Sequence, residues 1–431
     1  MKHIIRSFKY RNYRLFFAGQ SISLVGTWME RLAIGWLAYK LKDSALILGL
    51  VAFAGQIPAL FLMPLGGVLA DRYNRHKVLI ITQTLAMLQA IVLSILVFKG
   101  HVTIWHLMML NFSLGIINSV DMPTRQAFVI EMIGNKDDLS NAIALNSSMV
   151  NFARLAGPTL AGIIVAAFGE GMCFLINAIS YLAVITSLLL MKITPRIKPK
   201  KASAFVQLKK GLQYSFGFAP IKYMILLLSA VSLTAIPYLV LMPIFAKDIL
   251  HGGPKTLGFL MGFSGIGALI GAVYLASRKT VLGLGRVIVI ATVIFGASLV
   301  AFSFSRTIWL SEVLLIFTGM GMMIHMAASN TILQTITSED MRGRVMSLYT
   351  TSFMGIMPFG SLLAGSLANR IGAPHTLIIG GSICIAAAVA FSFKLPSLRE
   401  LAKPVYIERG IIEQVEKGVQ SASQLSVPPE N

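Results

Sequence analysis

The sequence predicts an all-α membrane protein with twelve transmembrane helices in two pseudo-symmetric six-helix bundles. Three observations lead to this fold class. Of the 431 residues, 56% are hydrophobic and 13% are charged, whereas about 25% of the residues in a soluble domain are charged. The apolar residues form long runs, and about 20 such residues are enough for a helix to cross a bilayer. The two halves of the chain also share short motifs.

The long runs are continuously apolar, whereas the strands of a membrane barrel would alternate between apolar and polar residues. We therefore expect helices rather than strands. In chain order, the expected helices cover residues 15–38, 46–70, 78–98, 104–123, 143–167, 171–191, 222–246, 256–277, 285–304, 308–333, 343–368 and 374–394.

Two motifs recur at about half the chain length. Leu48-Gly49 is repeated as Leu257-Gly258, and Ala161-Gly162 is repeated as Ala364-Gly365. Such weak repetition is expected of a duplicated six-helix unit.

The chain therefore divides into four parts. An N-terminal six-helix bundle covers 1–191, and a basic cytoplasmic connector covers 192–221. A C-terminal six-helix bundle covers 222–394, and a polar cytoplasmic tail covers 395–431.

The chain is strongly basic, with 37 Lys and Arg against 17 Asp and Glu and a net charge of +20. A basic chain often binds nucleic acid, but here most basic residues fall in connectors on one side of the expected membrane. This bias marks the cytoplasmic side. We therefore expect both termini in the cytoplasm, contact with anionic lipid headgroups and no nucleic-acid partner.

The sequence lacks the motifs of an enzyme. It has no HExxH pair, no phosphate-binding loop ending in Gly-Lys-Ser/Thr and no paired-Cys metal pattern. Cys173 and Cys384 both lie in apolar runs, which favours packing over disulfides. The first apolar run is too long for a signal-peptide core. We expect neither catalysis nor a cofactor, metal or cleavable signal.

The connection after the second predicted helix carries the most specific motif. Residues 67–77 read GVLADRYNRHK. This loop resembles the G-x-x-x-D-R-x-G-R-R motif of the major facilitator superfamily of membrane transporters, with Asn74 in place of the second glycine. The resemblance implies that the matching acid and arginines form a cytoplasmic gate. The residues matched to that gate are Gly67, Asp71, Arg72 and Arg75.

A second resemblance lies in the fifth predicted helix. Gly157, Pro158 and Gly162 follow the superfamily's antiporter motif, G-x-x-x-G-P-x-x-G-G, although Ala153 and Ala161 replace two glycines. Ordinary small-residue packing would explain the same pattern, because glycine permits close helix contact and proline permits a bend. Segments 7–14 and 121–126 resemble the bacterial efflux branch that includes macrolide and enterobactin exporters, which implies a bacterial inner membrane.

Polar side chains inside the predicted helices are the candidate substrate and proton pathway, because charges are costly in hydrocarbon. On the first, fourth and fifth helices, such residues recur at helical spacing and indicate a shared water-filled cavity. The candidate pathway residues are Glu30, Arg31, Asn118, Asp121, Asn151, Arg154 and His325.

Most of these candidates also have a structural explanation. Glu30 could brace its helix by pairing with a basic neighbour, and Asp121 could belong to an interfacial helix end. His325 could be a neutral, hydrogen-bonded core residue. Arg154 is harder to explain structurally, because a guanidinium near the membrane midplane needs a partner or water.

We expect Glu30 to carry the coupling proton, because it lies deepest of the acids and burial disfavours its charged form. Arg154 would be its counter-charge, unless the adjacent Arg31 neutralises it. Asp121 would then serve the cytoplasmic mouth and is the next candidate.

These features together predict a monomeric secondary transporter that exports an amphipathic small molecule by alternating access in exchange for protons. The export direction follows from the family resemblance. An uptake symporter or a lipid flippase on the same fold is the first alternative. A membrane sensor or scaffold is the second, and it would have to use the tail after residue 395.

Overall fold

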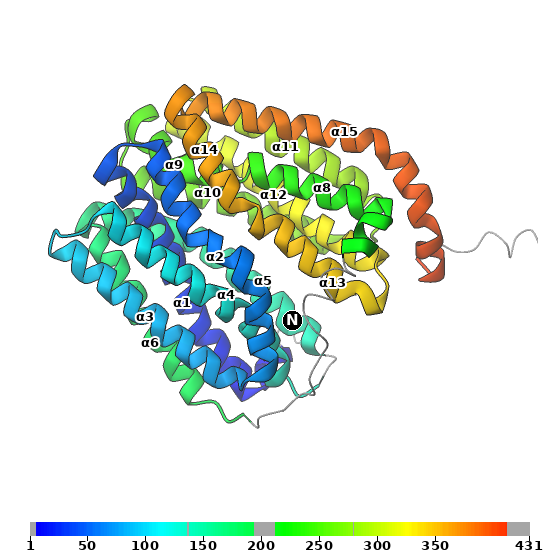
Figure 1. Cartoon of the computed structure of the whole chain (residues 1–431), viewed down its shortest axis with the longest axis horizontal. Helices are drawn as coiled ribbons and strands as arrows, with labels where there is room; N and C mark the ends of the chain where they lie inside the picture. Colours follow the sequence, from blue (N-terminus) through cyan, green and yellow to red (C-terminus); the bar gives the residue numbers. More distant parts are fainter. Residues whose placement is uncertain (1–5, 136–137, 194–211, 279, 412–431) are drawn as a thin grey trace, which may run out of the picture.

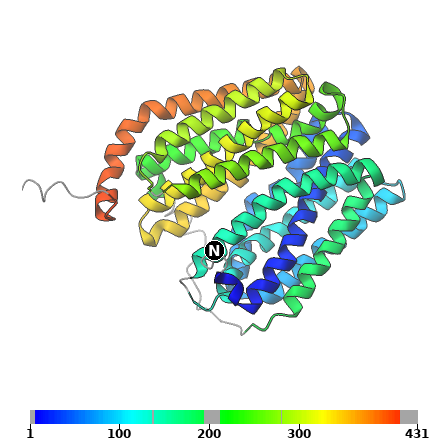
Figure 2. The ribbon, with the colours of Figure 1, turned by 180° about the vertical axis from the view of Figure 1, so that it is seen from behind.

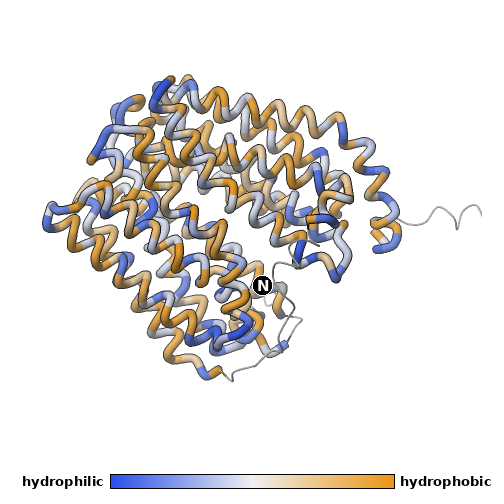
Figure 3. The backbone as a smooth tube through the Cα atoms, in the orientation of Figure 1, coloured by the Kyte–Doolittle hydropathy of each residue, from blue (hydrophilic) through white to orange (hydrophobic). Residues whose placement is uncertain are grey.

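The helices of the chain gather into two bundles in the computed structural model (Figure 1). The structure describes residues 6–135, 138–193, 212–278 and 280–411. Much of the predicted connector and the end of the predicted tail lie outside these residues. Hydrophobic residues cover the length of both bundles, and hydrophilic ones gather at helix ends and connections (Figure 3).

The first bundle contains the first six long helices. Within it, α1 packs against α5 and α6, α2 packs against α4, and α3 packs against α4 and α6. Its elements are η1 (Arg6–Lys9), α1 (Arg11–Lys42), α2 (Ala45–Arg72), α3 (Arg75–Phe98), α4 (Ile104–Met132), α5 (Leu139–Phe168) and α6 (Glu170–Leu189).

The second bundle repeats this arrangement. Within it, α10 packs against α12, α11 packs against α12 and α15, and α8 packs against α15. Its elements are α8 (Ala219–Thr234), α9 (Tyr238–Ile244), η3 (Phe245–Ile249), α10 (Pro254–Ser277), α11 (Leu284–Phe304), α12 (Ile308–Ile336), α13 (Glu339–Thr350), η4 (Thr351–Gly355), α14 (Met357–Ile371) and α15 (Ala373–Glu408).

The predicted fold class is confirmed, although two predicted helices are interrupted. The predicted helix 222–246 is divided into α8, α9 and the π-helical turn η3. The predicted helix 343–368 is divided into α13, the π-helical turn η4 and α14. Pro237 precedes α9 and Pro358 follows η4. Each proline lacks an N–H group and crowds the preceding turn, so each is a physical reason for an interruption.

The polar residues of α1 and α4 lower the mean hydropathy of these two helices. Within the described residues, ten helical stretches are long and apolar enough to cross a membrane, and α1 and α4 are not among them. Both are nevertheless as long as their neighbours and pack inside the first bundle. Their polar side chains can point into protein rather than lipid, so these two helices complete the predicted twelve.

The two ends of the molecule differ. We call the end where α1 begins the terminal face, and the end where α1 finishes the distal face. At the terminal face, the Asn12 Nδ2 donates to the Lys192 carbonyl at 2.8 Å, and Arg409 donates to the Thr337 carbonyl at 2.5 Å. The start of the chain, the start of the connector and the end of α15 therefore share this face.

The two bundles contact each other near the distal face, mainly through α2 with α14 and α5 with α10. A methyl group added at Gly162 would lie 2.8 Å from the Gly258 Cα, and one at Gly49 would lie 3.0 Å from the Gly365 Cα. Glycine is therefore required at both crossings. Figures 1 and 2 show the bundles diverging from here toward the terminal face.

Candidate functional site

Glu30 lies inside the first bundle and not between the bundles. Its carboxylate is 1% exposed, and its Oε2 accepts a hydrogen bond from the Asn177 amide on α6. Gly26, one turn earlier, explains this orientation: a methyl group there would lie 2.5 Å from the Asn177 Oδ1, so α1 and α6 are in close contact. The polar stripe of α1, which also includes buried Gln20 and Ser23, faces α6.

Part of the Glu30 carboxylate has no partner. Within the described residues, its Oε1 accepts no hydrogen bond, and no ion pair joins it to Arg31 or Arg154. The Gln89 amide on α3 approaches the carboxylate but remains outside hydrogen-bonding geometry. The expected pair between Glu30 and Arg154 is therefore not formed in this structure.

Asp121, in contrast, has partners for both carboxylate oxygens. Its Oδ1 accepts from the Thr82 hydroxyl at 2.8 Å and from the Gln83 amide at 2.7 Å, and its Oδ2 pairs with Arg125 at 2.9 Å. The carboxylate is 2% exposed. It lies inside the bundle because α4 continues nine residues beyond the predicted end at residue 123, past Pro123 and as far as Met132.

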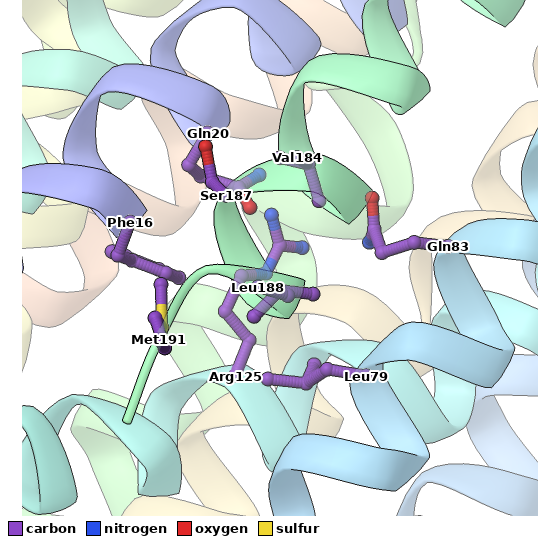
Figure 4. Close-up of a pocket in the computed structure, with 9 residues that line it drawn as sticks. All are labelled: Phe16, Gln20, Leu79, Gln83, Arg125, Val184, Ser187, Leu188 and Met191. Atoms are coloured by element: carbon purple, nitrogen blue, oxygen red, sulfur yellow. The ribbon is translucent and has the colours of Figure 1, made fainter. Parts of the chain in front are cut away.

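A small cavity lies beside this ion pair. Its volume of ≈ 10 Å³ is about the space that one water occupies. Figure 4 shows the Arg125 side chain pointing into it, with Gln83 from α3 and Ser187 from α6 around the same space. Arg125 was not among the predicted pathway residues, although it follows Asp121 by one helical turn. This spacing already places it on the same polar face of the helix as Asp121.

Arg31 and Arg154 meet at one aromatic ring. The Arg31 guanidinium on α1 lies 4.8 Å from the centre of the Trp28 ring, and the Arg154 guanidinium on α5 lies 5.3 Å from it. Arg31 is exposed and Arg154 is half-buried. Neither forms a hydrogen bond or an ion pair with another described residue. Trp28 was not among the predicted site residues.

Two of the residues predicted to form the gate, Asp71 and Arg75, lie together, and Arg75 is 6% exposed. The guanidinium donates to the Ala70 carbonyl at 2.9 Å, and it pairs with Asp71 at 3.0 Å and with Glu131 on α4 at 2.7 Å. Arg72 is exposed. A methyl group at Gly67 would have no atom of the described residues within 4 Å. The role of Gly67 therefore does not follow from packing in this conformation.

The antiporter-like motif joins α5 to two neighbouring helices. A methyl group at Gly157 would lie 2.4 Å from the Trp28 Cβ on α1. One at Gly258 on α10 would lie 2.6 Å from the Pro158 carbonyl and 2.8 Å from the Gly162 Cα. The motif thus holds α5 against α1 within its own bundle and against α10 of the other bundle.

Three predicted pathway residues lie apart from these clusters. His325 is fully buried between α11 and α12, where its Nδ1 lies 2.8 Å from the Thr292 hydroxyl. Asn151 donates to the Ser147 carbonyl of its own helix at 2.9 Å. Asn118 is half-buried on α4. Within the described residues, none of the three bonds to Glu30 or Arg154, although Asn151 lies one helical turn before Arg154 on α5.

Sequence comparisons relate the chain to membrane exporters. A family model described as "Transmembrane secretion effector" matches residues 5–415. The staphyloferrin A transporter of Staphylococcus aureus is 24% identical over 88% of this chain and 95% of its own length. Macrolide efflux protein A of Streptococcus pyogenes is 23% identical over 92% of this chain and 98% of its own. The multidrug efflux pump Tap of Mycolicibacterium fortuitum is 23% identical over 89% and 94%.

Solved structures share the fold at low identity. A POT family transporter in complex with 5-aminolevulinic acid has a TM-score of 0.72 at 12% identity, covering 90% of this chain and 96% of its own. A bacterial homologue of the lysosomal transporter Spinster, described as inward-facing and unoccupied, has a TM-score of 0.65 at 13% identity, covering 93% and 98%.

Proposed function

Because the chain belongs to the transmembrane secretion effector family of major facilitator transporters, we propose that it exports amphipathic small molecules by alternating access in exchange for protons. The relatives are named for a siderophore, macrolides and multiple drugs, which supports this substrate range. The protein works as a transporter, and the proton coupling, the direction and the site residues are parts of the proposal.

The arrangement of the bundles supports alternating access. They are joined at the distal face by the two glycine crossings and by side-chain contacts. Tyr39 donates to Asp248, and Lys247 pairs with Asp43. Each contact connects residues of different bundles. We assign the terminal face to the cytoplasm because basic residues concentrate there. This conformation would then be the inward-facing state, ready to take up cargo from the cytoplasm.

The outward-facing state would require closure of the terminal face. The cluster of Asp71, Arg75 and Glu131 lies at this face on α2, α3 and α4. In the family, the acid and arginine that match Asp71 and Arg75 form the gate. We assign them the same role, with the start of α13 near Gly343 as the surface that they meet on closure.

The single observation that carries the proton coupling is the contrast between Glu30 and Asp121. Asp121 is neutralised by Arg125 and accepts two hydrogen bonds. Glu30 is equally buried, has no ion pair within the described residues and retains a partnerless oxygen. A buried carboxylate without a cation is stable mainly when protonated. We therefore assign the coupling proton to Glu30.

Buried polar groups also offer a route to Glu30. Gln83 and Gln89 lie six residues apart on α3, about 9 Å along the helix, between Asp121 and Glu30. The Gln83 Oε1 and both amide atoms of Gln89 have no hydrogen-bond partner within the described residues. Buried groups of this kind usually bind ordered water. We assign them to a line of waters that connects the two carboxylates.

The test uses everted membrane vesicles, in which the terminal face would point outward. Vesicles containing the wild-type protein should accumulate erythromycin or staphyloferrin A when the lumen is acid, and should lose this accumulation when nigericin collapses the pH gradient. Accumulation only when the lumen is alkaline would indicate uptake by symport and contradict the proposal. A cysteine at Lys99, in a distal connection, should react with an impermeant maleimide in intact cells and not in everted vesicles.

A further inference from the structure

The Trp28 ring lies beside two arginines that form no ion pair within the described residues. Arg31 and Arg154 come from different helices, and both guanidinium groups lie within 5.3 Å of the ring centre. They repel each other, and within the described residues neither has an acid at ion-pair distance. Two such charges within the membrane-spanning part of a protein are costly without a counter-ion.

The cluster lies where the two bundles begin to diverge. On α5, Leu155 contacts α10, since a methyl group at Gly265 would lie 2.8 Å from its Cα. On α1, Gly35 faces Pro243 of α9. Arg154 and Arg31 lie within about one helical turn of these contacts, on the side toward the terminal face. Both remain accessible, with Arg31 exposed and Arg154 half-buried.

We propose that Arg31, Trp28 and Arg154 bind the anionic group of an amphipathic substrate, a carboxylate, sulfonate or phosphate next to an aromatic or apolar part. This proposal rests on the export function and specifies its substrate class. A guanidinium donates two parallel hydrogen bonds to such anions. The indole offers a flat apolar surface to the rest of the molecule.

The neighbouring charges leave this site positive. The Glu30 carboxylate lies one residue from Arg31, but it is turned toward Asn177 inside the first bundle. Asp121 and Arg125 neutralise each other. On the second bundle, the Tyr238 hydroxyl near Arg154 shares a hydrogen bond with Ser264. Since a proton on Glu30 would make the net charge beside Arg31 more positive, proton and anion do not compete locally. Their exchange would therefore have to operate through the movement of the bundles.

The experiment compares three probes that share a naphthalene ring and differ in the charge of its substituent. The full chain in phosphatidylcholine nanodiscs is titrated with 2-naphthoate, the uncharged 2-naphthamide and the cationic 2-naphthyltrimethylammonium, and binding is measured calorimetrically. Naphthoate should bind at least about tenfold more tightly than either other probe. Arg31→Gln and Arg154→Gln should each remove most of this preference. Arg31→Lys and Arg154→Lys should retain part of it, because the charge remains.

Arg286→Gln is the matched control, because Arg286 is an exposed arginine at the start of α11, remote from the cluster, and this variant should bind naphthoate like the wild type. Equal binding of the charged and uncharged probes by the wild type, no binding of naphthoate, or an undiminished preference in the two glutamine variants would each overturn the proposal. Properly folded variants are identified by an unchanged elution volume and unchanged thermal unfolding.

Two further measurements are needed. The first distinguishes a lipid headgroup from a soluble anion, and the second distinguishes failure of the anion site from failure of the export function. In phosphatidylglycerol nanodiscs, at a salt concentration that screens the general repulsion between the anionic surface and the probe, weaker naphthoate binding would identify a lipid headgroup as the natural anion, and unchanged binding would identify a soluble one. Both results agree with an anion site. A protein that prefers naphthoate but shows no accumulation driven by a pH gradient would keep the anion site and lose the export function. Gradient-driven export of uncharged cargo alone would keep the export function and lose the anion site.

Discussion

Gly162 on α5 and Gly258 on α10 face each other where the two bundles cross, so closely that neither position has room for a methyl group. The repeated motifs identify these residues as the counterparts of Gly365 and Gly49, which form the other crossing. One pseudo-symmetric contact is thus used twice to close the distal face. Because the contacts join backbone to backbone, they add no side chain that would have to reorder when the face opens.

A methyl group at this crossing should favour the opposite conformation. In Gly258→Ala, the new Cβ would lie 2.6 Å from the Pro158 carbonyl, and relieving such a clash is worth about 1–3 kcal/mol. The ratio of distal-open to distal-closed molecules should therefore rise by about 5–150-fold. Double electron–electron resonance measures this change between spin labels at His101 and Thr307, which lie in exposed distal connections of the two bundles. Opening of the distal face would appear as longer distances.

Gly217→Ala is the control for this experiment, since a methyl group there meets no described atom within 4 Å. Its distance distribution should match that of the parent protein. A Gly258→Ala distribution that also matches the parent would show that the crossing does not limit opening.

Asp71→Asn should slow transport more than it weakens substrate binding. Arg75 would keep its bonds to Glu131 and the Ala70 carbonyl, so the loop should stay folded while the gate loses one charge. Asp71 is 52% exposed, and such ion pairs are worth about 0–1 kcal/mol. We therefore expect turnover to fall by up to about fivefold with an unchanged dissociation constant. Wild-type turnover would remove Asp71 from the gate.

The N-terminal segment should detach from α5 when Asp138 is protonated. The Asp138 carboxylate, 3% exposed, pairs with Lys9 at 2.6 Å and accepts from the Tyr10 hydroxyl at 2.9 Å. The bond to Lys9 lowers the pKa of Asp138 and raises the pKa of Lys9. The attachment is then complete above the unfolded pKa of Asp, about 3.9, and below that of Lys, about 10.4. It is lost as the pH falls through the lowered pKa of Asp138 or rises through the raised pKa of Lys9.

Hydrogen exchange of residues 6–10 measures this attachment. In Asp138→Asn at pH 7, this segment should be as weakly protected, relative to the intrinsic exchange rate at that pH, as it is in the wild type in acid. Asp340→Asn, which removes an exposed acid at the start of α13, should have no effect there. Equal protection in Asp138→Asn and the wild type would show that the ion pair does not hold the segment.

The sequence was sufficient for the helices and their division into halves, because long apolar runs and repeated glycines depend on local composition. It was not sufficient to predict which residues each polar side chain contacts. The α1 stripe could be recognised as one face of a helix, but Gly26 and Asn177 on another helix decide that it faces α6. Likewise, Arg154 was expected beside Glu30, whereas the packing of Gly157 against Trp28 places it with Arg31. Such choices depend on packing between distant segments.

The central claim, that Glu30 couples proton entry to export, is tested most directly by gradient-driven flux in Glu30→Gln. Proteoliposomes containing this variant should exchange labelled for unlabelled substrate across the membrane, but should not concentrate substrate when only a pH gradient is supplied. Asp121→Asn should retain gradient-driven accumulation, because Asp121 is already neutralised by Arg125. If Glu30→Gln still concentrates substrate against its gradient, Glu30 is not the coupling residue, and Asp121 becomes the next candidate.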